Sequence, residues 1–195
     1  MPDLILNNKP LVEAIFELRW QLLDEPNGYI YDPHYKLLVG QVYEKIKHIY
    51  PFHQTLPQAS MPDEISAYIV QHRFRIEENK WPLMQIGPGI ITLNETQSYH
   101  WDDFKKRIAD LIDTIFSIYP SNNSGLKPNG LLLRYINAID FNFGENDIFA
   151  FFKDQLKTNI TFHESLFHET GVKNQPYGFD FKFTFCNAPH LASFF

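Results

Sequence analysis

The stretch that most constrains the fold is residues 131–143, LLLRYINAIDFNF, the longest run of strand-forming residues in the chain. An Asn-Gly turn signal precedes it. Because side chains alternate between the two faces of a strand, the even positions place Arg134, Asp140 and Asn142 on one face. The odd positions form a mostly apolar set: Leu131, Leu133, Tyr135, Asn137, Ile139, Phe141 and Phe143. The pattern predicts a strand inside a sheet, and it leaves open which face points outward.

Two further segments have strand character. Residues 11–20 alternate, so that Val12, Phe16 and Leu18 are expected to face a core and the charged residues between them the other side. Residues 64–77 predict a second strand. Residues 81–94 predict a third strand that is bent or bulged at Gly87-Pro88-Gly89, because proline removes a ladder donor and glycine adds freedom.

Two segments have helical periodicity. In the first, Asp32 is a candidate N-cap with Pro33 at the first helical position, and apolar residues recur at helical spacing from Leu38 until Pro51 ends the pattern. In the second, residues 101–119 carry one continuous apolar stripe, with Ser98 as a plausible cap. Residues 52–62, rich in proline and polar residues, predict a loop between the first helix and the second strand.

The order strand, helix, strand, strand, helix, strand predicts an α+β fold of the ferredoxin-like β-α-β-β-α-β type for residues 1–144. In that arrangement the sheet is antiparallel, the first and last strands are neighbours, and both helices cover one face. Residues 145–195 predict a short Phe-rich helix at 147–156 and a further strand at 179–185. This segment is expected to be the start of a second α+β half or an extension that packs on the first.

Charge and composition exclude several classes. The net charge of −6 argues against a nucleic-acid-binding protein, which needs a basic stripe to neutralise phosphates. The single cysteine, Cys186, excludes an internal disulfide, and there is no signal-peptide pattern or membrane-spanning apolar run. We therefore expect a cytoplasmic protein without membrane contact. Aromatic residues make up 16% of the chain, and a Phe-rich core is a simpler interpretation than a stacking surface.

No catalytic or metal-binding motif emerges. His163 and His168 are five residues apart, which on a helix splays them by roughly 140° instead of aligning them as in H-E-x-x-H. Glu13 and Glu17 lie about 13 Å apart on a strand, beyond the separation of paired glycosidase carboxylates. Cys186 has no recognisable base and orienting group around it. We predict no cofactor and no metal, and the sequence favours a non-enzymatic protein while leaving an enzyme open.

The open face of the sheet is the best candidate surface. Its candidate residues for binding a ligand or a partner are Glu13, Glu17, Arg19 and Arg134, together with Tyr135 and Asn137 if the odd positions of the last strand face outward. The simpler alternative is a solvated or covered face on which the glutamates pair with the arginines across strands.

The segments PLVEAIFELRW (residues 10–20) and LLLRYINAIDF (residues 131–141) resemble a sporadically distributed family of uncharacterised bacterial proteins. The helix at residues 99–119 and QIGPGIITLN (residues 85–94) are similar to that family too. The resemblance implies no established activity. The family's patchy distribution hints at an association with mobile or defence genes, and its members tend to be longer than this chain.

Two hypotheses follow. The first is a non-enzymatic interaction module that uses the open sheet face or an exposed strand edge to hold a protein partner or a second copy of itself. The second is a small-ligand-binding or enzymatic domain with a polar site on the open sheet face, motivated by charges on central strands.

Overall fold

The computed structural model describes residues 9–26, 28–96, 98–120, 125–168 and 171. The chain divides into two compact units, Met1–Ile139 and Asp140–Phe195, which are described separately below. The fold is mixed α+β, as predicted. The division lies a few residues before the one at residue 144 that the sequence pattern suggests.

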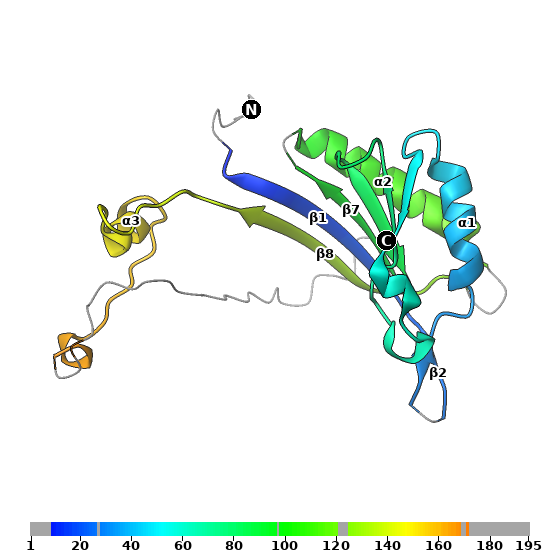
Figure 1. Ribbon diagram of the computed structural model, residues 1–195, viewed down its shortest axis with the longest axis horizontal. Helices are drawn as coiled ribbons and strands as arrows, with labels where there is room; N and C mark the ends of the chain where they lie inside the picture. The colour runs from blue at the N-terminus through cyan, green and yellow to red at the C-terminus, as the bar shows by residue number, and fades with distance from the viewer. Residues whose placement is uncertain (1–8, 27, 97, 121–124, 169–170, 172–195) are drawn as a thin grey trace, which may run out of the picture. The chain divides into compact units, whose positions relative to one another are not determined.

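The first unit is built on a six-stranded antiparallel sheet (Figure 1). Its strands, in spatial order, are β4 (Phe52–Thr55), β5 (His72–Arg75), β6 (Leu83–Gly87), β7 (Ile90–Glu95), β1 (Leu11–Trp20) and β8 (Pro128–Asn137). A two-stranded ribbon of β2 (Leu23–Asp24) and β3 (Ile30–Tyr31) extends from the end of β1. The short helices η1 (Pro57–Ser60) and η2 (Asp63–Ile65) connect β4 to β5.

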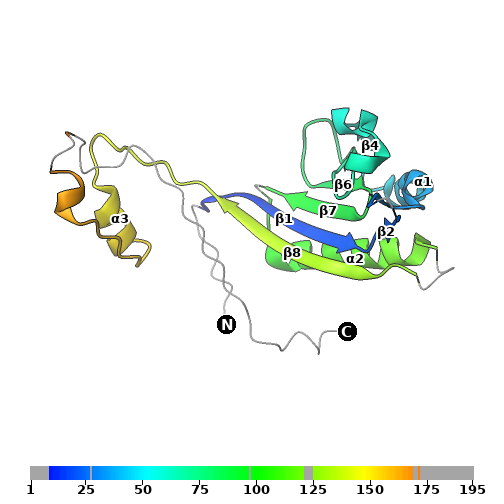
Figure 2. The ribbon, with the colours of Figure 1, turned by 90° about the horizontal axis from the view of Figure 1, so that it is seen from below.

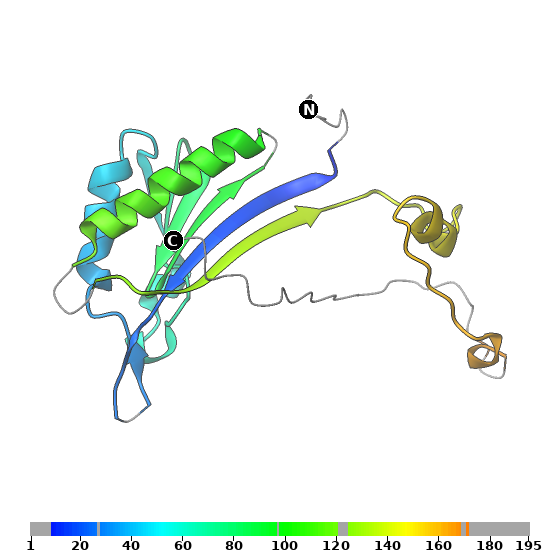
Figure 3. The same cartoon turned by 180° about the vertical axis from the view of Figure 1, so that it is seen from behind.

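The two long helices cover one face of this sheet. α1 (Tyr35–Ile46) and α2 (Trp101–Ile118) lie on the same side of it, as the view from behind shows (Figure 3). Both helices and the adjacency of β1 and β8 agree with the sequence prediction. The opposite face has no helix packed on it among the described elements, and β7, β1 and β8 lie side by side when it is seen from below (Figure 2).

The ferredoxin-like order is not confirmed, because the strand order differs. Four strands, not two, lie between the helices, and they form a continuous meander from β4 to β7. One of the two additional strands is β4, and the other results from the turn at Pro88-Gly89. It closes a two-residue hairpin between β6 and β7, with Gly89 at φ +76°, where the sequence predicts a bend within one strand. Proline followed by a residue of positive φ suits the two central positions of a type II turn.

Other boundaries also differ from the prediction. β4 lies in the segment predicted as a loop. Of the predicted strand at residues 64–77, only the part that forms β5 is a strand in the structure. The predicted strand at residues 131–143 corresponds to β8, which begins earlier, at Pro128, and ends earlier, at Asn137. Val12 does not face the helices: the register shifts between Leu11 and Glu13, and the Val12 side chain is half exposed while Leu11 packs on the core.

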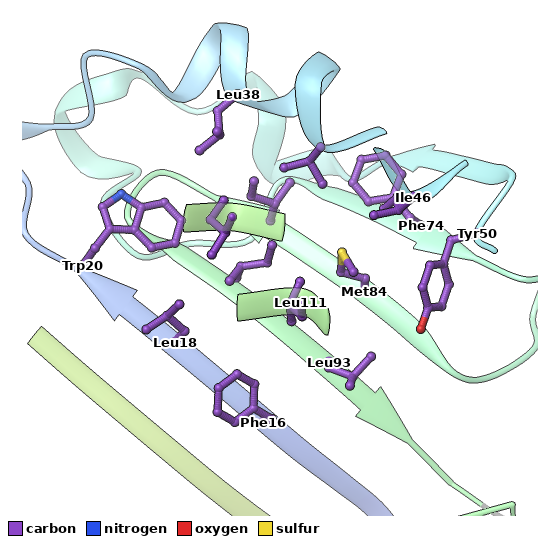
Figure 4. Close-up of a cluster of buried hydrophobic side chains, with 14 of the residues drawn as sticks. Phe16, Leu18, Trp20, Leu38, Ile46, Tyr50, Phe74, Met84, Leu93 and Leu111 are labelled. Atoms are coloured by element: carbon purple, nitrogen blue, oxygen red, sulfur yellow. The ribbon is translucent and has the colours of Figure 1, made fainter. Parts of the chain in front are cut away.

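The core lies between the sheet and the helices (Figure 4). From β1 it receives Phe16, Leu18 and Trp20, which are all buried. The helices and the remaining strands contribute further buried side chains, among them Leu38, Ile46, Phe74, Met84, Leu93 and Leu111. The predicted helical stripes therefore do form the helix side of the core, although Trp101 at the start of α2 is largely exposed.

One buried carboxylate ties three chain segments together. Asp32 accepts hydrogen bonds from the indole nitrogen of Trp20 (2.9 Å), the backbone N–H of His34 (2.9 Å) and the hydroxyl of Tyr119 (3.3 Å). The contact with His34 is made just before α1, whose N-cap is His34 and not the predicted Asp32. Burial and then the nearby Asp32 raise the pKa of Tyr119, so its hydroxyl stays a donor. The end of β1, the start of α1 and the end of α2 thus share one acceptor.

The second unit contains α3 (Ile148–Asp154), within the predicted helix at residues 147–156, and the short helix η3 (Glu164–Leu166). Asp147 caps α3 by accepting from the backbone N–H groups of Phe149 and Ala150. The phenylalanine rings of this unit contact one another edge to face. Among its described residues, however, Ile148 is the one apolar side chain that is buried. The predicted strand at residues 179–185 and Cys186 lie outside the described residues.

We predict that Asp32→Ala lowers the free energy of unfolding by about 3 kcal/mol, because it leaves the buried indole N–H of Trp20 without an acceptor. Urea unfolding followed by tryptophan fluorescence measures the change. Asp24→Ala, at an exposed position of the β2–β3 ribbon, is the matched control and should change stability by less than about 0.5 kcal/mol. Equal midpoints for the two variants would contradict the assigned role of Asp32.

Candidate functional site

The open face of the sheet carries the candidate site. The residues of β1 that alternate with the buried ones, Glu13, Ile15, Glu17 and Arg19, lie on this face. The register places Asn94 of β7 opposite Ile15 and Thr92 opposite Glu17. On β8, Arg134 is opposite Ile15 and therefore shares this face. Four of the six predicted site residues, Glu13, Glu17, Arg19 and Arg134, thus lie on the face that the sequence analysis selected.

A continuous chain of hydrogen bonds crosses this face, which we call the polar ladder. It runs from Arg73 on β5 through Gln85 on β6 and Thr92 and Asn94 on β7 to Glu13 on β1. The guanidinium nitrogens Nε and Nη2 of Arg73 donate to Gln85 Oε1 at 3.0 and 2.9 Å. Gln85 Nε2 donates to Thr92 Oγ1 (3.3 Å), Thr92 Oγ1 to Asn94 Oδ1 (2.9 Å), and Asn94 Nδ2 to Glu13 Oε1 (2.9 Å).

The centre of the polar ladder is shielded from solvent. Thr92 and Asn94 are only 4% and 5% exposed, although neither α1 nor α2 packs on this face. One contribution comes from the chain preceding β5, whose backbone crosses the end of the β6–β7 hairpin: a Cβ on Gly87 would lie 1.9 Å from the carbonyl oxygen of Ile69. Because buried polar groups are costly without partners, mutual pairing along the ladder is what makes its burial tolerable.

A second polar group lies toward the end of β1. Glu17 and Arg19 form an ion pair at 2.6 Å, and the Arg19 guanidinium lies 5.3 Å from the ring centre of Tyr68. The Tyr68 hydroxyl donates to the carbonyl oxygen of Trp20 and accepts from the Asn129 side chain. The pairing between Glu17 and Arg19 is along one strand, whereas the sequence analysis expected pairs across strands. The Arg19 side chain is 45% exposed and that of Glu17 15%, so the pair is partly shielded from solvent.

Arg134 differs from the other candidates. Within the described part of the chain, its side chain makes no hydrogen bond and no ion pair, so the expected pairing with Glu13 or Glu17 is absent there. Its side chain is exposed on β8.

Tyr135 and Asn137 lie on the other face. Tyr135 is opposite Ala14, whose side chain is buried under the helices, and Asn137 is opposite Leu11. The Tyr135 hydroxyl lies 2.8 Å from that of Tyr99, just before α2, and the two rings meet edge to face. The six candidate residues therefore do not form one site, because the alternation that places Arg134 on the open face turns Tyr135 to the helix side.

β8 itself is exposed along its length. It pairs only with β1 among the described strands, so it is an edge of the sheet. Every residue from Leu131 to Asn137 is exposed, and apolar side chains lie on both faces of the strand. Leu131, Leu133 and Tyr135 are on the helix side, and Leu132 and Ile136 on the open side. Neither α1 nor α2 buries the helix-side residues of this strand.

Four residues of the polar ladder are not among those predicted from the sequence: Arg73, Gln85, Thr92 and Asn94. Their signal is the recurrence of polar residues at alternate positions in the otherwise apolar segment QIGPGIITLN. These residues are seen to share one face only if Pro88-Gly89 is read as a hairpin turn, because that turn places Gln85 directly opposite Thr92.

The second unit has an open hollow of about 430 Å³ lined mainly by acidic and amide side chains. These include Asp140, Asn142, Asn146, Asp147 and Asp154. In the same unit, His163 accepts from the backbone N–H of Ser165, which places it in a local turn. No group of three or more His, Cys, Asp or Glu side chains in the described ranges is arranged to hold a metal ion.

Comparison with known protein families, curated proteins and solved structures gives no match to this chain. None of the helices among the described residues has the length and apolar character needed to cross a membrane. The function must therefore be argued from the geometry alone.

We predict that Asn94 and Glu13 are energetically coupled. Asn94→Ala should destabilise the fold by about 1–2 kcal/mol, and a double-mutant cycle with Glu13→Ala should give a coupling of about 1 kcal/mol, because each residue loses the same hydrogen bond. Urea unfolding of the four proteins measures it. The same cycle with the exposed Glu25→Ala is the control and should be additive; additivity with Glu13→Ala as well would contradict the polar ladder.

We also predict that Gly87→Ala destabilises the protein by about 2 kcal/mol, because its Cβ would overlap the backbone of Ile69. Gly40→Ala is the matched control. That position lies inside α1 with free space around it, so alanine should stabilise by about 0.5–1 kcal/mol. Thermal unfolding of both variants tests the opposite signs, and a neutral Gly87→Ala would show that residues 66–71 do not cover this face.

Proposed function

We propose that this chain is a non-enzymatic interaction module that self-associates by pairing β8 of one copy with β8 of a second copy. The observation that carries the proposal is the exposed edge of β8. Edge strands of natural sheets are usually protected by charges, prolines, bulges or short length. From Leu131 to Asn137, β8 carries one charge and no proline, and it pairs with β1 without a register shift from Gly130 to Ile136.

A second copy suits this edge because an antiparallel pair of identical strands is self-complementary about a two-fold axis. In a register centred on Leu133, Arg134 of each copy is opposite Leu132 of the other, so the two guanidinium groups do not face each other. Tyr135 is then opposite Leu131, which extends the apolar helix-side surface across the junction. The paired strands satisfy the outward backbone groups of β8 and cover apolar side chains on both faces.

The open face gives less support to the alternative prediction, a small-ligand or catalytic site. Its central polar groups in the described residues, from Arg73 to Glu13, already bond to one another, and Glu17 bonds to Arg19. Groups satisfied in this way stabilise the sheet without requiring a ligand. The alternative stays a prediction, with Arg134 as its remaining candidate.

The experiment is light scattering after size exclusion on the full chain, over a hundredfold range of concentration. We expect a concentration-dependent dimer. Leu133→Lys should raise the dimer dissociation constant at least tenfold, or about 1.4 kcal/mol, because two ammonium groups would meet at the symmetry axis. Leu37→Lys, on the exposed side of α1, is the matched control and should leave the dimer unchanged.

Three results would overturn the proposal. One is a monomer at every concentration, and another is a dimer with the same dissociation constant in Leu133→Lys as in the unmodified chain. The third is a stoichiometric complex with a different protein that Leu133→Lys disrupts, since this would assign the edge to a partner of another kind.

A further inference from the structure

We propose that His53 and His72 form a binding site for a divalent late first-row transition-metal ion such as Zn²⁺ or Cu²⁺. The two residues lie on neighbouring strands, β4 and β5, at the end of the sheet opposite to β8. Neither belongs to the candidate surfaces described above. The site rests on the geometry of this imidazole pair and is independent of the proposed self-association.

The distance between the ring nitrogens fits a shared metal ion. Nε2 of His53 and Nδ1 of His72 are 3.0 Å apart. Two nitrogens bound to one ion at about 2.0–2.1 Å, with an angle between 90° and 110°, lie about 2.9–3.4 Å apart. In the metal-free protein the same distance suits an N–H···N hydrogen bond, in which one ring donates and the other accepts. The ion would lie to one side of the line between the two nitrogens, where it displaces the shared proton, and the rings adjust so that both lone pairs point at it.

The rings are held in place by aromatic contacts. His53 stacks on Phe74, with ring centres 5.1 Å apart and planes at 24°, and it stacks on His72 at 5.2 Å. Tyr43 and Tyr35 of α1 lie beside His53 and His72, at 6.0 and 6.4 Å. Ligands whose orientation is fixed in this way lose less entropy on binding a metal ion.

The accessibility of the pair and the type of its ligand atoms suit an ion of this class. His53 is exposed, which gives an ion access from solvent. Imidazole nitrogens select zinc, copper and nickel over magnesium and calcium, which prefer oxygen ligands.

The coordination is open. Because no third His, Cys, Asp or Glu side chain completes the group within the described residues, water fills the remaining positions of the ion. A bound ion would link the edge strand β4 to β5, so that binding stabilises the folded chain against unfolding.

The test uses the full chain, with Zn²⁺ titrated by calorimetry and Cu²⁺ followed by electron paramagnetic resonance at neutral pH. We expect one ion per chain, with hyperfine coupling to two nitrogens. His53→Gln and His72→Gln should each weaken binding at least tenfold. The matched control is His48→Gln, at an exposed position on the C-terminal side of α1, and should bind like the unmodified chain.

A second readout separates loss of the site from loss of the fold. Zn²⁺ should raise the melting temperature of the unmodified chain and of His48→Gln, and it should not raise that of His53→Gln. Because His53→Gln also loses the stacking on Phe74, each variant is compared with its own melting temperature without Zn²⁺. The proposal is overturned if the unmodified chain shows no saturable binding of the ion. It is also overturned if either His53→Gln or His72→Gln still binds the ion as tightly, because the ion would then belong to other histidines.

Discussion

The carboxylate of Asp32 is the interaction on which the first unit depends. It is a single buried acceptor for an indole, a backbone amide and a phenol, which come from the end of β1, the start of α1 and the end of α2. Each donor would be costly to bury alone, and together they compensate the burial of the charge. Trp20 is fully buried, and its ring meets Tyr119 edge to face at 6.0 Å. The angle between sheet and helices is therefore set by polar as well as apolar contacts.

Side chains are buried on both faces of the sheet, but through different interactions. On the helix side, alternate residues of β1 pack into an apolar core with the helices. On the open side, the polar ladder joins four neighbouring strands through side chains, in addition to their backbone hydrogen bonds. A ladder of this kind fixes the register, since a shift of one residue would turn its members to the wrong face. The register of the central strands is thereby fixed both by the apolar core and by the polar ladder, whereas the register of β8 depends only on its pairing with β1.

Much of the architecture could be predicted from local patterns. Periodicity identifies the buried sides of β1 and α2, because apolar residues recur with the period of the strand or helix that buries them. The pattern is the alternation at Phe16 and Leu18 in β1 and the stripe through Phe104, Leu111 and Ile115 in α2. The adjacency of β1 and β8 was predicted from the ferredoxin-like arrangement, and the structure has it although the order of its strands differs from that arrangement. The hairpin at Pro88-Gly89 could not be separated from a bend, since both require the same residues, and this one choice changes the number of strands and the order of the sheet.

The candidate surface was predicted only in part, for a related reason. Charged residues at Glu13 and Arg19 indicate an open face on a single strand, but the partner of Glu13 is Asn94 of β7, a strand that is separate from β6 only because of the hairpin. Tyr135 and Arg134 are neighbours in sequence and lie on opposite faces, so the face of each is decided by pairing with β1. Local sequence does not carry that information.

The position of β1 has a consequence for how the chain reaches this structure. β1 is made first, yet it lies between β7 and β8, and Phe16 pairs with Leu133, a sequence separation of 133 − 16 = 117 residues. Contacts so distant are slow to form, because the loop must be closed before they stabilise anything. During synthesis, an alternating strand with one apolar side must remain unpaired on that flank until β8 has left the ribosome. The chain therefore completes its sheet late, and β1 is the segment that needs protection from aggregation in the meantime.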